Sequence, residues 1–170
     1  MEHLVPVYDA LWAAGGSHGI RDFGVYAMDS LRLEEGYRGW KVDMTHEYTP
    51  LMAGLDRFVD LKKPDFAGKA ALAQESRRGP RERLVPLLLD EAGDADAPAC
   101  ATVWKAGERV GLVTSGGFGH AIGRSIALAY LRRDLAAIGT RLEVEILGDR
   151  RRATVASEPI YDPTNARPKM

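Results

Sequence analysis

The chain has 170 residues, of which 45% are hydrophobic and 28% charged, and its formal net charge at pH 7 is −1. This length fits one domain or two small ones that share an interface, and the composition is that of an ordinary globular protein. So small a net charge gives no overall field that would recruit nucleic acid or an anionic membrane. No apolar run is long enough for a membrane span, and the start lacks the apolar core of a signal peptide. Because Cys100 is the only cysteine, no intrachain disulfide can form, and we expect a reducing, cytoplasmic location.

The first predicted element is an amphipathic helix. Its apolar residues recur at helical spacing, and they are Leu4, Val7, Tyr8, Leu11 and Trp12. Pro6 is tolerated because it lies in the first turn, and Gly15 and Gly16 end the helix. No strand precedes the helix to cover this stripe. We therefore expect the chain to be a piece of a longer protein, and to self-associate through this helix when isolated.

Two further helices are predicted before residue 80. The second begins with Asp22 as its cap and ends before Gly36. Its expected inward stripe is formed by Phe23, Tyr26, Ala27, Ser30 and Leu31. The third is shorter, from Gly68 to Ser76, with Asp65 as its expected cap. Between these helices, the stretch GYRGWKVDMTHEYTP at 36–50 follows neither the helical nor the strand period.

From Leu84 onward the apolar period becomes two, which is typical of strands. In one segment Ile126, Leu128 and Tyr130 alternate with small residues, and in another Leu142, Val144 and Ile146 alternate with charged ones. Expected turns lie at Ala106-Gly107, Gly116-Gly117 and Gly148-Asp149, and the acidic stretch 90–98 is expected to be a surface loop. We predict an α+β protein whose second half, 84–160, is a barrel of about six antiparallel strands. The natural division falls at 76–83, giving domains 1–80 and 81–170.

Pattern alone names no activity. The four histidines have no metal-ligand spacing, and SGGFGHAIG at 115–123 lacks the glycine spacing of dinucleotide-binding loops. That segment is interpreted as a bend between strands, where glycine allows positive φ or close backbone approach. The arginine runs at 77–83 and 150–152 favour solvated turns over an anion-binding surface.

Several ordered motifs resemble the aminomethyltransferase (glycine cleavage T-protein) superfamily. They are GIRDFGVYAMDSLRLEEGYRGW…TPLMAGL, DFAGKAAL and VGLVTSGGFGHAIGRSIALAYL, and they extend over residues 19–160. The details YRGWKVDMTHEYTP and EPIYDPTNARPKM are similar to the C-terminal folate-binding part of dimethylglycine and sarcosine dehydrogenases. The resemblance implies that 1–80 is the C-terminal part of a folate-binding α/β domain and that 81–170 is the family's C-terminal β-barrel.

The resemblance also implies a function. It points to part of an enzyme that transfers one-carbon units from a methylamine-derived substrate to tetrahydrofolate and forms methylene-tetrahydrofolate. The family residues that it maps onto this chain as cofactor-binding are Arg21, Arg167 and Tyr161. The family's catalytic aspartate belongs to an N-terminal segment with no match here, so no catalytic residue is assigned. The upstream half of the folate domain, and a flavin domain carrying FAD, are the implied partners.

Three alternatives stay open beside these assignments. Arg21 could instead brace a helix end by pairing with Asp22 or Glu34, and Tyr161 could be a packing residue. The chain could be a non-catalytic folate-binding relative, although EEGYRGWKVD lacks the Cys and Gln of the loop that marks those proteins. It could also be a module that only docks domains together.

Overall fold

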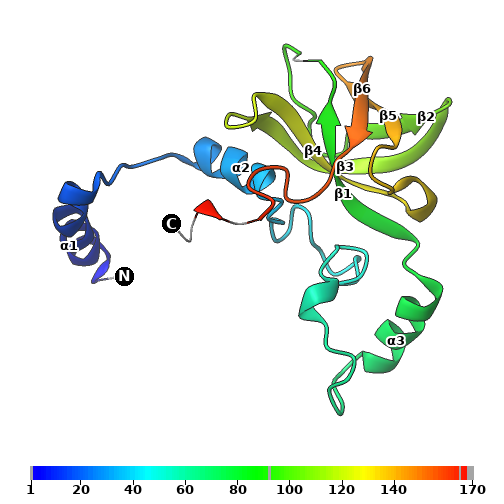
Figure 1. Ribbon diagram of the computed structural model, residues 1–170, viewed down its shortest axis with the longest axis horizontal. Helices are drawn as coiled ribbons and strands as arrows, with labels where there is room; N and C mark the ends of the chain where they lie inside the picture. Colours follow the sequence, from blue (N-terminus) through cyan, green and yellow to red (C-terminus); the bar gives the residue numbers. More distant parts are fainter. Residues whose placement is uncertain (1, 92, 165, 168–170) are drawn as a thin grey trace.

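In the computed structural model, residues 2–91, 93–164 and 166–167 are described, and they form three α-helices and a closed β-barrel (Figure 1). The helices are α1 (Leu4–Gly15), α2 (Val25–Glu34) and α3 (Lys69–Arg78), with 3₁₀ turns η1 (Gly16–His18), η2 (Asp56–Phe58) and η3 (Arg133–Leu135). The strands are β1 (Glu82–Leu89), β2 (Thr102–Lys105), β3 (Glu108–Gly119), β4 (Arg124–Arg132), β5 (Arg141–Ile146) and β6 (Asp149–Val155). None of the described helices is both long and apolar enough to cross a membrane.

The predicted barrel is confirmed. Its six strands are all antiparallel and follow the order β1-β4-β3-β2-β5-β6, which closes because β6 pairs with β1. The predicted turns at Ala106-Gly107 and Gly148-Asp149 join β2 to β3 and β5 to β6. The predicted acidic loop at 90–98 connects β1 and β2, and of its described residues only Ala97 is buried.

Strand β4 is buried on both of its faces. Ala127, Ala129 and Leu131 point into the barrel and belong to its internal core. The alternate residues Ile126, Leu128 and Tyr130 belong to a second core outside the barrel, where they pack with Leu33 of α2 and Met52. This arrangement explains the alternation of large and small residues in the sequence, and it attaches the first half of the chain to the barrel.

The glycine pair at Gly116-Gly117 corrects one prediction, because it lies inside β3 rather than at a turn. Gly116 pairs with Ala127 in the ladder, and a Cβ atom on Gly116 would lie only 2.3 Å from the carbonyl oxygen of Ala97. The glycine therefore permits close backbone approach, as such a residue in a strand often does. The chain reverses instead at residues 120–123, where Gly123 has φ +67°.

Both predicted caps are wrong. Helix α2 begins after Gly24, and the Asp22 carboxylate instead accepts a hydrogen bond from the Tyr8 hydroxyl at 3.0 Å. Helix α3 begins after Gly68, whose φ of +85° turns the chain, and no side-chain bond caps it among the described residues. The Asp65 carboxylate accepts the Phe66 amide at 2.8 Å, so it is used within the preceding loop.

The expected inward stripe of α2 is wrong except at Ser30, which is buried. Phe23, Tyr26 and Leu31 are 67%, 93% and 52% exposed, and Ala27 is exposed as well. The buried residues of α2 are Ser30, Leu33 and Glu34, which face the barrel. Polar side chains face the barrel because this side of α2 meets the backbone at the end of β3, which needs hydrogen-bond partners as well as apolar contact.

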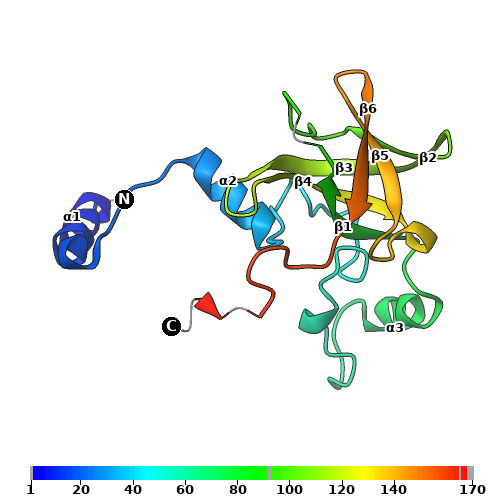
Figure 2. The ribbon, with the colours of Figure 1, turned by 45° about the horizontal axis from the view of Figure 1, so that its top comes forward.

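Helix α1 lies away from the barrel, joined to α2 by the extended segment 19–24 (Figures 1 and 2). It has the predicted bounds, but none of its residues is buried. Its stripe Leu4, Val7, Tyr8, Leu11 and Trp12 is between 41% and 67% exposed. Tyr8 and Trp12 stack on each other, with ring centroids 5.9 Å apart, so part of the apolar surface is covered within the helix itself.

Candidate functional site

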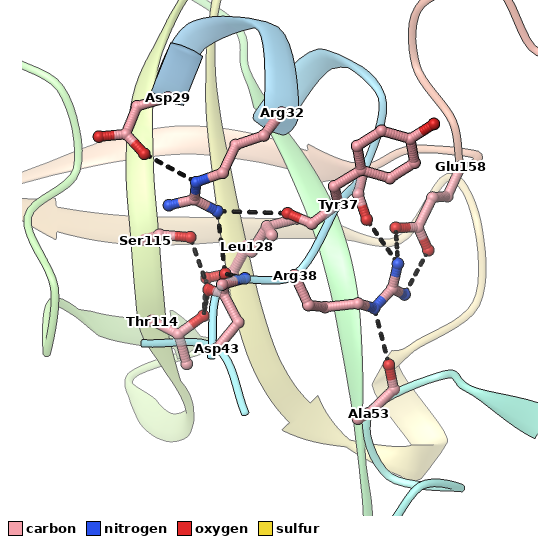
Figure 3. Close-up of polar contacts among 12 residues, drawn as sticks. Asp29, Arg32, Tyr37, Arg38, Asp43, Ala53, Thr114, Ser115, Leu128 and Glu158 are labelled. Atoms are coloured by element: carbon pink, nitrogen blue, oxygen red, sulfur yellow. Dashed lines mark hydrogen bonds and ion pairs between the residues drawn. The ribbon is translucent and has the colours of Figure 1, made fainter. Parts of the chain in front are cut away.

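The irregular stretch 36–50 is fixed to the barrel by a buried carboxylate, that of Asp43, which has no exposed surface (Figure 3). It accepts hydrogen bonds from the hydroxyls of Thr114 at 2.5 Å and Ser115 at 2.6 Å, both on β3. It also accepts the Gly39 amide at 2.8 Å and the guanidinium of Arg32 at 3.0 Å. A buried charge is tolerated only when it is paired and hydrogen-bonded, and here both conditions hold.

Arg32 extends the same network back to helix α2. Its guanidinium is 3.0 Å from Asp43, 2.8 Å from the Asp29 carboxylate and 3.3 Å from the Tyr37 carbonyl oxygen. One arginine therefore bridges a helix, the loop that follows it and the carboxylate that holds that loop on the barrel.

Tyr48 closes the far end of the stretch by stacking on Tyr130 of β4. The ring centroids are 3.7 Å apart and the planes differ by 8°. The Tyr130 hydroxyl donates to the Asp43 carbonyl oxygen at 2.9 Å. Burial raises the pKa of both phenols, so both stay protonated over the physiological range. Tyr48 thus packs inside the fold, whereas the other two aromatics of this stretch, Tyr37 and Trp40, are more than half exposed.

Arg38 connects the loop to the C-terminal segment (Figure 3). Its guanidinium pairs with both carboxylate oxygens of Glu158, with Nη2 to Oε2 at 2.6 Å. The same group donates to the carbonyl oxygens of Ala53 at 2.8 Å and Gly36 at 2.6 Å. Gly36 has φ +70°, and a Cβ atom on it would lie 2.3 Å from the Glu158 carboxylate, so only glycine fits here.

Backbone contacts dock the rest of this segment. The amides of Ile160 and Tyr161 both donate to the Glu34 carbonyl oxygen, at 3.1 and 3.0 Å. The Glu34 carboxylate accepts the amides of Ala121 at 2.7 Å and Ile122 at 3.2 Å. The end of α2 therefore holds both the β3–β4 turn and the segment that leads to Tyr161.

The structure brings together two of the three predicted cofactor-binding residues. The Arg167 guanidinium lies 5.0 Å from the centroid of the Tyr161 ring, within cation–π range. The Asp162 carboxylate orders the turn between them, because it accepts the amides of Ala166 at 3.0 Å and Arg167 at 2.9 Å. These backbone hydrogen bonds lower the pKa of Asp162, and the one from Ala166 contributes most. Asn165 and 168–170 of the motif EPIYDPTNARPKM lie outside the described residues.

Arg21 is not part of that cluster. It is exposed in the segment between η1 and α2, and its guanidinium donates to the Ile20 carbonyl oxygen at 2.9 Å. The alternative role as a helix-end brace finds no support in the described contacts, because Asp22 bonds Tyr8 and Glu34 bonds the β3–β4 turn. The assignment of Arg21 to the cofactor remains a prediction.

A small pocket of about 350 Å³ adjoins the Arg38–Glu158 pair. It is lined by Tyr37, Arg57 and the prolines Pro159 and Pro163, among others. Among the described residues there is no grouping of three histidine, cysteine, aspartate or glutamate side chains that could hold a metal ion. Aromatic, guanidinium and proline surfaces suit a flat organic molecule with acidic groups. Such surfaces could position a ligand of this kind. The hydroxyls of Thr114 and Ser115, which donate to the Asp43 carboxylate, are buried and do not line this pocket.

Sequence reasoning missed the residues that build this site, namely Arg32, Arg38, Asp43 and Glu158. The only available signal was the density of charges in the stretch 36–50, which is unusual for a segment that lies between two patterned elements. Their partners Thr114, Ser115 and Ala53 are far away in sequence, and no local pattern identifies them.

Two family models match the chain in order. The GCVT N-terminal domain matches residues 1–63, and the glycine cleavage T-protein C-terminal barrel domain matches residues 82–162. The second match coincides with the barrel, from the first residue of β1 to the docked C-terminal segment. The chain therefore belongs to the aminomethyltransferase (glycine cleavage T-protein) superfamily.

Particular relatives agree with this assignment. Human mitochondrial dimethylglycine dehydrogenase is 42% identical over 98% of this chain, and the aminomethyltransferase of Parasynechococcus marenigrum is 41% identical over 89%. The crystal structure of glycine cleavage system aminomethyltransferase T from Bartonella henselae covers 94% of the chain with a TM-score of 0.83 and 29% identity. The chain spans only 19%, 41% and 44% of these three proteins, respectively.

Proposed function

We propose that this chain is the folate-contacting, C-terminal part of an enzyme that forms methylene-tetrahydrofolate from a methylamine-derived substrate. The observation that supports it most is the agreement of two independent matches: both family models occur in order, and one aminomethyltransferase fold extends over nearly the whole chain. The compartment we propose is the cytoplasm, on the basis of the single cysteine.

The residues present are compatible with tetrahydrofolate. The Tyr161 ring and the Arg167 guanidinium offer a flat surface and a positive charge side by side, and the adjoining pocket offers Arg57. A pterin ring has flat faces and the folate tail carries carboxylates, which arginine binds well.

When bound, tetrahydrofolate would supply the amine nitrogen that attacks the iminium carbon of the oxidised methylamine. In this proposal Arg21 donates hydrogen bonds to the acceptor edge of the pterin, while the adjacent Tyr161 and Arg167 contact the folate tail, with Arg167 on its carboxylate. The Arg38–Glu158 pair and the Glu34 carbonyl hold Tyr161 in place. We assign no catalytic residue to this chain. The carboxylate near the reactive nitrogen, and any FAD, would come from other parts of the whole enzyme.

Calorimetric titration of the chain with tetrahydrofolate tests the proposal. Since only part of the site is present, we expect weak binding, with Kd of about 1 mM. Arg21→Ala, Arg167→Ala and Tyr161→Ala should each weaken it, and the control Arg141→Ala on the exposed start of β5 should not. Equal affinity in all four variants would remove the assigned residues from the site.

A chimaera provides the stronger test. Here the chain replaces the corresponding segment of the Parasynechococcus marenigrum aminomethyltransferase, which it matches over 152 residues. We expect the folded chimaera to bind tetrahydrofolate tightly and to lose about tenfold in affinity when Arg21 becomes alanine. A chimaera with native-like melting behaviour that binds no folate would contradict the proposed function.

A domain-docking role is the second candidate, and the exposed apolar surface of α1 and α2 favours it. A pure docking module would associate through those helices and would show no folate dependence in either titration.

A further inference from the structure

A second, larger cavity lies away from the Arg38–Glu158 region. It has a volume of about 1030 Å³ and lies between the loop at 47–52, helix α3 and the start of the barrel. Its apolar lining includes Met52, which is 3% exposed, and Leu72 of α3. None of its lining residues is among those assigned to folate, so what it binds is a separate question.

The Glu75 carboxylate lies in the wall of this cavity. Glu75 is only 6% exposed, and one oxygen accepts the Thr49 hydroxyl at 2.9 Å. That hydroxyl is itself oriented by the Met52 amide, which donates to it at 3.1 Å. The second oxygen accepts no hydrogen bond from the described residues. Every described side-chain nitrogen or oxygen that is fully shielded from solvent has a hydrogen-bond partner, so this oxygen is not fully shielded. This oxygen therefore opens to the cavity.

A buried carboxylate with one neutral donor is incompletely compensated, and a cation is the partner that compensates it best. No described basic group forms an ion pair with Glu75. Arg78, one helical turn further along α3, also lines the cavity, but its guanidinium contacts neither Glu75 nor another described carboxylate. The Glu75 oxygen is thus available to a ligand.

Arginine side chains also line the cavity. Arg133 directs one guanidinium nitrogen to the Arg78 carbonyl oxygen at 2.6 Å, which places the group at the C-terminal end of α3. Its remaining donors have no carboxylate partner among the described residues, since the nearby Asp134 is held by Arg132 at 2.8 Å. The lining thus combines the buried Glu75 carboxylate with three arginines, Arg78, Arg81 and Arg133, and with the exposed carboxylates of Glu47 and Asp134, which favours a ligand that carries both signs of charge.

We propose that this cavity binds a zwitterionic amino acid whose two charged groups are separated by an apolar chain. The ammonium group of the ligand contacts Glu75, and its carboxylate contacts Arg78 and Arg133. Its methylene chain packs on Met52 and Leu72. Glu75 and Arg78 lie one helical turn apart on α3, and Arg133 reaches the carbonyl oxygen at the end of that helix. A ligand whose ammonium and carboxylate are separated by several methylene groups can reach from Glu75 to both arginines, which favours an ω-amino acid over an α-amino acid.

The test uses ε-aminocaproate as the probe, titrated into the 170-residue chain by calorimetry. Caproate and hexylamine are the matched controls, because each keeps the alkyl chain of the probe. Caproate lacks its ammonium group, and hexylamine lacks its carboxylate. We expect ε-aminocaproate to bind about tenfold more tightly than either, as one further charge-assisted contact predicts. Equal affinity for the three compounds would overturn the proposal.

Two variants test which residue binds each charged group of ε-aminocaproate. Glu75→Gln keeps the size and the acceptor for Thr49, and it should remove the advantage of ε-aminocaproate over caproate. Arg133→Gln should remove its advantage over hexylamine, whereas the exposed controls Glu108→Gln and Arg141→Gln should keep both. If a variant is poorly folded, amide chemical shifts of the wild-type chain decide instead: ε-aminocaproate must shift residues 47–52 and 72–79, and shifts confined to other regions refute the site.

Discussion

The Asp43 carboxylate and the Ser115 hydroxyl are 2.6 Å apart although 72 positions separate them in the sequence, and their hydrogen bond is buried. With the Thr114 and Arg32 contacts, it attaches the stretch 36–50 to the barrel wall.

Replacing Asp43 by alanine should therefore be severe. It leaves the Ser115 hydroxyl and the Gly39 amide without their acceptor, the Thr114 hydroxyl with only the Leu128 carbonyl oxygen at 3.2 Å, and Arg32 without its buried partner. We expect a loss of about 3 kcal/mol in the free energy of unfolding. Ser115→Ala, which removes one donor, should cost about 1 kcal/mol. Urea denaturation measures both. The control Asp56→Asn, in a surface pair with Arg83, should change stability by less than about 0.5 kcal/mol. If Asp43→Ala behaved like this control, the network would not hold the loop.

The Arg38–Glu158 pair should control the docking of the C-terminal segment. Glu158→Ala removes both bonds to the guanidinium while leaving the barrel intact, so the amides of Ile160 and Tyr161 should exchange with deuterium about tenfold faster. Amides in the β3–β4 ladder should exchange as before. Protection of Ile160 that is unaffected by the mutation would show that backbone bonds to Glu34 suffice for docking.

Acid should loosen the turn that carries Arg167. Backbone hydrogen bonds hold the pKa of Asp162 below its ordinary value, so the ionised carboxylate stabilises the turn fully at pH values above the ordinary aspartate pKa. Its contribution is lost as the pH falls through the lowered pKa. An NMR pH titration should show the Ala166 and Arg167 amide shifts moving together with the Asp162 carboxyl. Asp162→Asn should abolish that coupling, and amide shifts that ignore the titration would contradict the assignment.

The bare stripe of α1 should drive self-association of the isolated chain. Each of its large side chains is worth roughly 1.5–3 kcal/mol when buried, and all are substantially exposed. Sedimentation velocity should reveal dimers or larger species that become monomers when Leu11 is replaced by lysine. The control Leu147→Lys changes a still more exposed leucine, 77% against 62% for Leu11, in the β5–β6 turn and should leave the association unchanged. A wild-type chain that sediments as a monomer at all concentrations would refute this prediction.

Periodicity predicted the barrel well because β4 and β5 carry an alternation that local burial enforces. It failed where tertiary contacts decide. The α2 stripe was assigned by apolarity, yet the helix docks through Ser30 and Glu34, which satisfy backbone groups of a distant turn. Likewise Gly116 resembles a turn residue, but its role depends on Ala97, which arrives from another loop.

Strand β4 also limits how the molecule can be divided. Its outward side chains Ile126, Leu128 and Tyr130 are covered by residues of the first half, including Leu33 and Met52. A barrel excised at the boundary near residue 81 would expose this apolar wall to water, so it should precipitate or recruit another surface. Conversely, a one-residue slip of β4 would force the large side chains into a space shaped for Ala127 and Ala129. The helical segment therefore acts as a template that selects one register of the sheet.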